Sequence, residues 1–272
     1  MPIVGSEASG LYGRGYGGGG ISFGPPYTPP VVKQLLITNA AVFAVQVLLG
    51  RQLPFDQIFA VVPRLALGSL WLWQPFTYMW LHGGLLHLAM NCFMLWMFGS
   101  PLAMAWGAKR FVRFYLLCGV GAGFAIASWP YLAVQIGLAS PATLGALTIG
   151  ASGAIYGVLL AYSLTWPDRS LMFFPLPVAI RAIWLIPITF FLTVYADQSG
   201  VVSHVGHLGG VLVGWILLRR GGTAAGLPTW TQLKWRWQRL RMRRRLRAVR
   251  WDEDASRHRR DAPRRDDDRT LH

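Results

Sequence analysis

Two side chains that could carry out nucleophilic acyl transfer lie in separate apolar stretches of this 272-residue chain. Ser152 stands in a Gly-Ala-Ser-Gly run, and His207 stands near the start of a later stretch that is rich in glycine. A hydroxyl with an imidazole that takes its proton is the minimum equipment for this reaction. Because ionisable side chains inside a membrane span are costly and tend to mark function, the pair indicates a hydrolase that works within the bilayer.

Glycines on both stretches would allow the two side chains to meet. They flank Ser152, and Gly210 and Gly214 lie three and seven residues after His207, on one face of a helix. Small residues let membrane helices approach closely. We therefore expect two helices in contact, with His207 acting as general base on Ser152 and then as general acid to the leaving amine. Taken alone, the stretch that holds Ser152 also fits a serine that only helps helices to pack.

No carboxylate is placed to complete a catalytic triad, since Asp168 and Asp197 fall at the ends of apolar stretches. We therefore expect a dyad in which packing orients the imidazole. Tyr156 lies four residues after Ser152, on nearly the same helix face, and its ring is the expected packing partner.

Another apolar stretch, which precedes that of Ser152 in the chain, supplies polar groups of another kind. His87 and Asn91 are four residues apart and share a helix face. An imidazole N–H and a side-chain amide could stabilise a developing oxyanion, helped by the backbone N–H of Ser152. His82 is expected to hold the preceding loop by hydrogen bonds. The alternative for His87 and Asn91 is a hydrogen-bonded pair that links two helices.

The composition places these residues in a membrane protein. The chain is 53% hydrophobic and only 14% charged, whereas a soluble domain carries about 25% charged residues. We therefore expect an all-α, polytopic membrane protein with six transmembrane helices, and five spans is the alternative count because the first and fourth stretches are the shortest. The expected spans are about 34–50, 80–99, 111–133, 148–166, 179–196 and 201–218.

Basic residues are distributed unevenly around these spans. With six spans, most of these residues lie next to span ends on the same side of the membrane. The positive-inside rule assigns this side to the cytoplasm, and both termini then lie there as well. We expect a multi-pass protein of a bacterial cell (inner) membrane. The residues concerned are Lys33, Lys109, Arg110, Arg113, Arg169, Arg181, Arg219 and Arg220.

The chain divides into three expected parts. Residues 1–30 are rich in glycine and proline and are expected to be a disordered cytoplasmic tail. Residues 31–222 would form the six-span domain, and 223–272 a basic cytoplasmic tail. Nine Lys/Arg and no acid occur in 231–251, interleaved with tryptophan, which predicts binding to anionic lipid headgroups. Nucleic-acid binding is the rival, but no recognition fold accompanies the charge.

Together, the three motifs resemble those of the rhomboid family of intramembrane serine proteases. The match rests on a His-x4-His-x3-Asn pattern that ends at Asn91, on the Gly-Ala-Ser-Gly run followed by Tyr156, and on His207-x2-Gly-x3-Gly. The Trp-Gln-Pro-Phe-Thr-Tyr-Met segment at 73–79 also looks like the family's first loop. The resemblance covers roughly residues 34–218 and leaves both tails unexplained.

The resemblance implies a six-helix bundle with a water-filled cavity open to the non-cytoplasmic side. It makes Ser152 the nucleophile and His207 the base, with oxyanion donors and supporting residues around them. It implies single-span membrane proteins as substrates, entering between the second and fifth spans, and no cofactor or metal. Some relatives have a Trp-Arg pair where this chain has Gln74, so the attachment of the first loop can differ. The implied donors are His87 and Asn91, and the supporting residues are His82, Tyr156, Gly150 and Gly210.

Three other functions fit parts of the pattern. A metalloprotease or metal transporter would explain the histidines, but the chain has no His-Glu-x-x-His run and no acid in the middle of a span. A non-catalytic rhomboid-like module that binds transmembrane segments would be expected to have lost the serine or the histidine, and this chain keeps both. A channel would need a ring of like charges or a repeated pore motif, which the sequence lacks.

Overall fold

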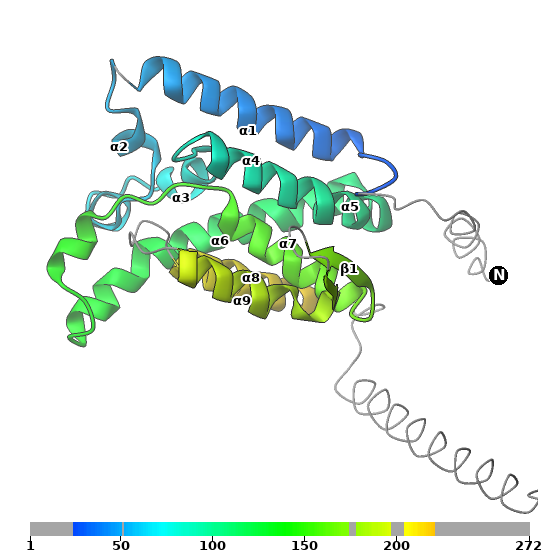
Figure 1. The fold of residues 1–272 in the computed structure, drawn as a ribbon. Coiled ribbons are helices and arrows are strands. Elements are labelled where there is room, and N and C mark those ends of the chain that lie inside the picture. Colours follow the sequence, from blue (N-terminus) through cyan, green and yellow to red (C-terminus); the bar gives the residue numbers. More distant parts are fainter. Residues whose placement is uncertain (1–23, 51, 174–177, 197–203, 221–272) are drawn as a thin grey trace, which may run out of the picture. The chain divides into compact units, whose positions relative to one another are not determined.

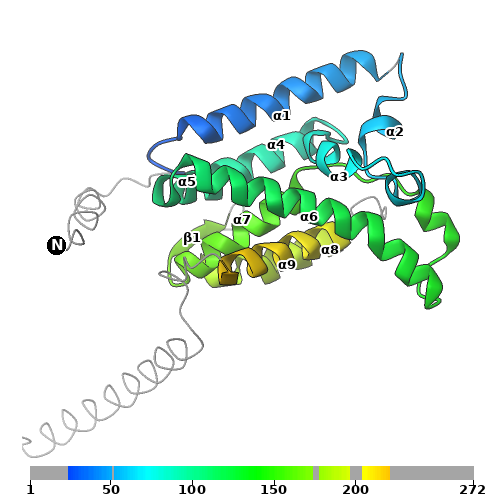
Figure 2. The ribbon, with the colours of Figure 1, turned by 180° about the vertical axis from the view of Figure 1, so that it is seen from behind.

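The computed structural model describes residues 24–50, 52–173, 178–196 and 204–220, which are mostly helical (Figures 1 and 2). The expected tails at 1–30 and 223–272 therefore lie almost wholly outside the described residues. The α-helices are α1 (Pro30–Leu49), α2 (Phe55–Phe59), α3 (Gln74–Thr77), α4 (Leu85–Met94), α5 (Ser100–Trp106), α6 (Ala108–Gln135), α7 (Ser152–Thr165), α8 (Leu185–Ala196) and α9 (His204–Arg220). Strands β1 (Ser170–Phe173) and β2 (Val178–Arg181) pair antiparallel. Shorter turns of π- or 3₁₀-helix are η1 (Arg64–Gly68), η2 (Tyr78–Trp80), η3 (Leu95–Gly99), η4 (Pro141–Gly145) and η5 (Ala182–Trp184).

Within the part of the chain that the structure describes, three helical segments are long and apolar enough to cross a membrane: Pro30–Leu49, Leu85–Trp106 and Ala108–Gln135. The second of them joins α4, η3 and α5. Ser152–Thr165 and Ala182–Tyr195 are apolar but shorter. The structure thus supports a helical membrane protein, and the count of six spans stays a prediction.

The structure moves several of the expected span boundaries: the second span ends at Trp106 and not at residue 99, and the helix of the fourth begins at Ser152 and not at residue 148. Two further shifts have a clear local cause. The second span was expected from residue 80 but begins at Leu85, because Gly84 has an extended backbone (φ 164°, ψ 170°) that no helix contains. The fifth was expected from residue 179, but residues 179–181 belong to β2 and the helix α8 follows at Leu185. The β-branched residues of β2 pair with β1, with Ile180 opposite Leu171, and such residues favour strands.

At the centre of the bundle, α6, α7 and α9 pack against one another, and α1 lies outside α4 (Figures 1 and 2). Small residues make the central packing close: Gly157 of α7 lies against Cys118 of α6, and Gly121 of α6 lies against Val213 of α9. On α1, Ile37 and Leu48 are 66% and 69% exposed. An apolar outer surface of this kind suits a helix that faces lipid.

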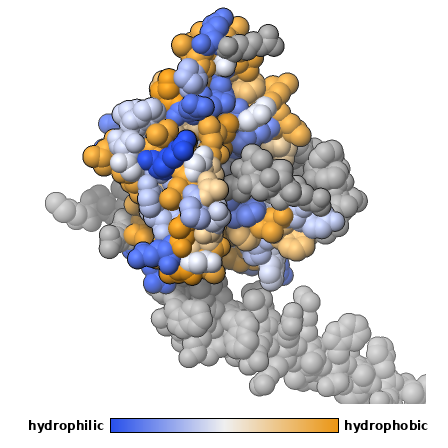
Figure 3. All heavy atoms as spheres, turned by 90° about the vertical axis from the view of Figure 1, so that its left-hand side faces the viewer, coloured by the Kyte–Doolittle hydropathy of each residue, from blue (hydrophilic) through white to orange (hydrophobic). Residues whose placement is uncertain are grey.

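Residues 52–79, which connect α1 to the approach to α4, fold into α2, η1, α3 and the start of η2 at one end of the bundle. Its exposed side chains include Leu70, Leu72, Trp73 and Phe76. Figure 3 views this end and shows hydrophobic and hydrophilic residues side by side on its surface. A mixed surface is compatible with a position at the membrane–water boundary.

Gln74 holds this segment together from within. Its side chain is fully buried; Oε1 accepts a hydrogen bond from the Val62 N–H at 3.1 Å, and Nε2 donates to the Gln57 carbonyl oxygen at 3.0 Å. The side chain thus cross-links the segment to itself, so here the attachment that the sequence left open is made within the protein.

We expect Gln74→Leu to destabilise the protein, because it leaves the buried Val62 N–H and the part-buried Gln57 carbonyl oxygen without this partner. Such losses cost about 1–3 kcal/mol, which corresponds to a fall of roughly 2–12 °C in Tm. Thermal unfolding in detergent measures the effect. Gln57→Leu is the matched control, since the Gln57 side chain is exposed and only its backbone is used. Equal Tm values for the two variants would contradict the cross-link.

Candidate active site

The two residues that could form a nucleophile–base pair lie in contact. Ser152 is the first residue of α7, and His207 lies in the first turn of α9. The distance from His207 Nε2 to Ser152 Oγ is 2.9 Å, which is a hydrogen-bonding distance. His207 is buried, with 3% of its surface exposed. The arrangement places an imidazole nitrogen where it can take the hydroxyl proton.

Glycines permit this contact between α7 and α9. A Cβ added at Gly210 would overlap the Gly153 carbonyl oxygen, and one added at Gly214 would lie 3.2 Å from the Cα of Gly157. The two helix backbones therefore touch along the face that carries His207. Side chains at these positions would separate the helices and, with them, the serine from the histidine.

We expect Gly210→Ala to destabilise the bundle by about 1–3 kcal/mol, the usual cost of overpacking, and to slow every reaction that needs the Ser152–His207 contact. Thermal unfolding and the rate of labelling by a fluorophosphonate measure the two effects. Gly145→Ala is the control, because its Cβ would meet nothing closer than 3.9 Å. A Gly210→Ala protein as stable and as reactive as the wild type would disprove the close contact.

His87 and Asn91 surround the backbone just before Ser152. Gly150 has φ +127°, a conformation that L side chains rarely adopt, and its N–H donates to the Tyr78 carbonyl oxygen at 3.0 Å. The position of a Cβ on Gly150 would be 2.9 Å from His87 Nε2 and 3.9 Å from Asn91 Nδ2. The His87 ring thus occupies the space that a larger residue would need, and the Asn91 amide lies at van der Waals distance from it.

The hydrogen bonds around these two side chains leave donors facing Gly150. The Gly83 N–H donates to His87 Nδ1 at 3.3 Å, so the proton of the neutral ring is on Nε2. Asn91 is 7% exposed, and its buried Nδ2 has no hydrogen-bond partner among the residues that the structure describes. An unused buried donor is uncommon in folded proteins and calls for an explanation.

Comparison with known proteins agrees with the motifs. A family model for the rhomboid domain matches residues 70–221, more than half of the chain. The chain belongs to the rhomboid family. The match includes the segments that contribute Gln74, His87, Ser152 and His207, whereas α1 lies outside it.

Individual relatives cover different shares of this rhomboid chain. It is 29% identical over 224 residues to Rhomboid protein 1, mitochondrial, of Saccharomyces cerevisiae, which is 73% of this chain and 60% of the yeast protein. It is 32% identical over 148 residues to RHOMBOID-like protein 6, mitochondrial, of Arabidopsis thaliana, covering 53% of this chain and 42% of that protein. Rhomboid protease AarA of Providencia stuartii is 28% identical over 194 residues, with 66% and 68% covered. This chain therefore spans less than two thirds of the yeast and plant relatives.

The names of these relatives do not point to one membrane. Two of the three are mitochondrial and the third comes from a bacterium. The comparisons support a membrane protein of the rhomboid family, and the bacterial inner membrane stays a prediction.

In this rhomboid domain the hydrogen bond by which His82 holds the loop comes from its backbone and not from its ring. Among the described residues neither ring nitrogen has a hydrogen-bond partner, and the loop is held instead by the His82 backbone N–H, which donates to Gln46 Oε1 at 3.0 Å. The ring is buried, and its centroid lies 5.2 Å from that of His87. Burial, followed by the neighbouring His87, lowers the pKa of His82 to about 4. The ring is therefore neutral at physiological pH.

Gln46 on α1 is a supporting residue that the sequence analysis missed. Besides accepting from His82, its Nε2 donates to Asp56 Oδ1 at 2.8 Å. It thus ties α1 and α2 to the residues that precede α4, the helix of His87. A polar side chain within the first apolar stretch was the available signal.

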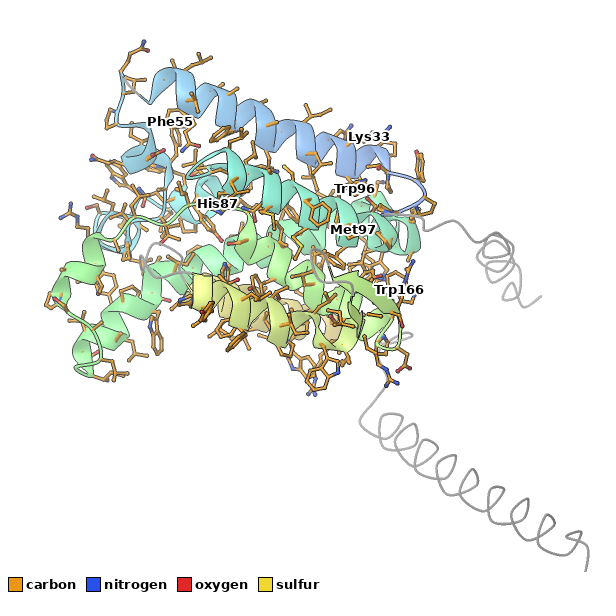
Figure 4. The ribbon with its side chains drawn as sticks, in the orientation of Figure 1. Lys33, Phe55, His87, Trp96, Met97 and Trp166 are labelled. Carbon is orange, nitrogen blue, oxygen red and sulfur yellow. The ribbon has the colours of Figure 1, made fainter. Side chains whose placement is uncertain are left out.

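Tyr156 contacts the candidate base. Its ring stacks on that of His207, with 4.2 Å between centroids and 17° between planes. One face of the imidazole is thus stacked on the Tyr156 ring while its Nε2 lies at hydrogen-bonding distance from Ser152. Figure 4 shows His87, from α4, at the same end of the bundle as Phe55 and far from Lys33 and Trp166.

Proposed function

We propose that this chain is an intramembrane serine endopeptidase that cleaves transmembrane segments of single-span membrane proteins by a Ser152–His207 dyad. The observation that carries the proposal is the 2.9 Å contact between Ser152 Oγ and His207 Nε2. A serine that only helped two helices to pack would not need an imidazole at this position. Membership of the rhomboid family supports the same reaction.

In the proposed reaction, Ser152 Oγ attacks the carbonyl carbon of a substrate peptide bond while His207 Nε2 takes its proton. The tetrahedral intermediate collapses, the C–N bond breaks, and the imidazolium returns the proton to the leaving amine. Water then hydrolyses the acyl-enzyme by the same proton transfers in reverse order. The face of the Tyr156 ring carries partial negative charge and stabilises the imidazolium that forms beside it.

The oxyanion of that intermediate would be stabilised from α4 and from the start of α7. The donors are the Nε2–H of His87, the unused Nδ2–H of Asn91 and the backbone N–H of Ser152. The last belongs to the first turn of α7, where N–H groups have no partner within the helix and the helix dipole favours negative charge. Each such donor typically contributes about 2.7–4 kcal/mol to the transition state.

For the orientation, we propose that the end of the bundle with Lys33, Lys109, Arg169 and Arg219 faces the cytoplasm. Lys33 lies in the first turn of α1, Lys109 in the first turn of α6 and Arg219 in the last turn of α9, and Figure 4 shows Lys33 and Trp166 at this end. By the positive-inside rule, both termini are then cytoplasmic and the dyad lies toward the opposite face. The membrane would be a bacterial inner membrane, with the tail 223–272 on anionic lipid.

The proposal is tested by exposing the protein, reconstituted in liposomes, to a fluorophosphonate and to a fluorogenic transmembrane substrate. We expect phosphonylation of Ser152, located by mass spectrometry, and cleavage that the phosphonate blocks and a chelator does not. Modification of another serine alone, or no reaction by a folded protein, would rule out the dyad and favour a non-catalytic module. Cleavage abolished by the chelator would instead support the metalloprotease alternative.

A further inference from the structure

Helix α8 faces the bundle along a single stripe that is partly polar. Leu185 and Thr189 are buried, and Thr193 follows at the same four-residue spacing and is half-buried. By contrast, Phe191 and Tyr195 are 68% and 70% exposed. The stripe packs against α7, so its threonines lie at a helix–helix interface although the remainder of α8 is apolar.

Thr193 makes a hydrogen bond that leaves α8. Its Oγ1 lies 2.9 Å from the hydroxyl oxygen of Tyr156 on α7, and also 2.7 Å from the Thr189 carbonyl oxygen, to which it donates. A hydroxyl has one proton, and that of Thr193 is used toward the carbonyl. The Tyr156 hydroxyl is therefore the donor, and Thr193 Oγ1 is its acceptor.

The same tyrosine ring contacts the imidazole of the dyad. Its two ends are fixed by different helices: the hydroxyl by Thr193 of α8, and the ring face by His207 of α9, with centroids 4.2 Å apart. The contacts form an unbroken series from Thr193 to Tyr156, from Tyr156 to His207, and from His207 to Ser152. Helix α8, which contributes neither the nucleophile nor the base, thus reaches the base through two contacts.

We propose that Thr193 is a positioning residue, which accepts the Tyr156 hydroxyl proton and thereby couples the place of α8 to the orientation of His207. The inference rests on the proposed function. A ring whose hydroxyl is anchored cannot tilt away from the imidazole, so it stays parallel when the base becomes positively charged during attack. A displacement of α8 that separates Thr193 from Tyr156 removes this restraint.

The test compares Thr193→Val, which keeps the branched shape but has no acceptor, with Thr193→Ser, which keeps the hydroxyl. From the usual net strength of a neutral hydrogen bond, we expect kcat to fall roughly three- to tenfold in Thr193→Val with little change in KM, and recovery to within about twofold in Thr193→Ser. Thr165→Val is the matched control, because Thr165 donates to the carbonyl four residues earlier in the same way, at 2.6 Å, and touches no site residue. It should keep the wild-type kcat.

A double-mutant cycle with Tyr156→Phe separates positioning from packing. If both side chains act through their mutual hydrogen bond, the double variant Tyr156→Phe/Thr193→Val is no slower than the slower single variant. Additive losses, a Thr193→Ser protein as slow as Thr193→Val, or wild-type kcat in Thr193→Val would each overturn the inference. These outcomes leave the wild-type reaction of Ser152 intact, whereas a wild type that does not react with the fluorophosphonate refutes the proposed function itself.

Discussion

Cleavage of a transmembrane substrate is expected to stop in both Ser152→Ala and His207→Ala while each variant remains folded in the membrane. Alanine at 152 removes the atom that attacks the substrate, and alanine at 207 removes the group that takes its proton. Residues of such a unit act together, and losing one of them lowers kcat by about 10⁴–10⁶. Turnover is measured in proteoliposomes over hours, so that a fall in kcat of this size can be detected.

A histidine on the same helix provides the control for this prediction. His204 lies one turn before His207, with 6.4 Å between ring centroids, and it is not part of the proposed dyad. His204→Ala should therefore retain most of the wild-type turnover. Thermal unfolding of all three variants shows whether a loss of activity is a loss of fold. Normal turnover by either dyad variant would falsify the proposed chemistry.

The pairing of Ser152 with His207 could be predicted from sequence because each residue lies in a short local pattern of glycines. Glycine at fixed helical spacing implies a close helix contact, and a hydroxyl and an imidazole on two such helices have few other uses. The stacking partner Tyr156 followed from its four-residue offset from the serine. What the sequence could not supply is the distance between the two helices, which the structure gives as a direct contact.

Polar contacts that no motif marks were not predictable. Gln46 joins Asp56 and His82, and Thr193 meets Tyr156 from another helix. A polar residue in an apolar stretch indicates that some partner exists, but it does not say which one, because the partner depends on how the helices rotate and pack.

The predicted starts of two spans were wrong for a local reason. Hydropathy cannot distinguish a helix from the apolar backbone that leads into it, so the residues before α4 and those of β2 were counted as parts of spans. The pair of glycines before Leu85 and the alternating β-branched residues 178–180 were the signals that should have ended those spans. The consequence reaches the site, since His82 lies in the loop and not on the helix of His87.

Asn91 should show a different signature from an ordinary buried asparagine. We expect Asn91→Ala to lower kcat by about 10²–10³ with a modest change in KM, because an oxyanion donor acts in the transition state and not on the bound substrate. Its Nδ2 has no partner among the described residues, so few existing interactions are lost and Tm should change little. Steady-state kinetics and thermal unfolding measure the two quantities.

Asn39 is the matched control for that substitution. It is 2% exposed on α1, and its Nδ2 donates to the Leu35 carbonyl oxygen at 2.7 Å. Asn39→Ala should lower Tm, because a buried hydrogen bond is lost, and should leave kcat near the wild-type value. Asn91→Ala would then lose activity but keep its stability, whereas Asn39→Ala would lose stability but keep its activity. An unchanged kcat in Asn91→Ala would assign Asn91 to helix packing, and the oxyanion would have to be stabilised by His87 and the Ser152 backbone alone.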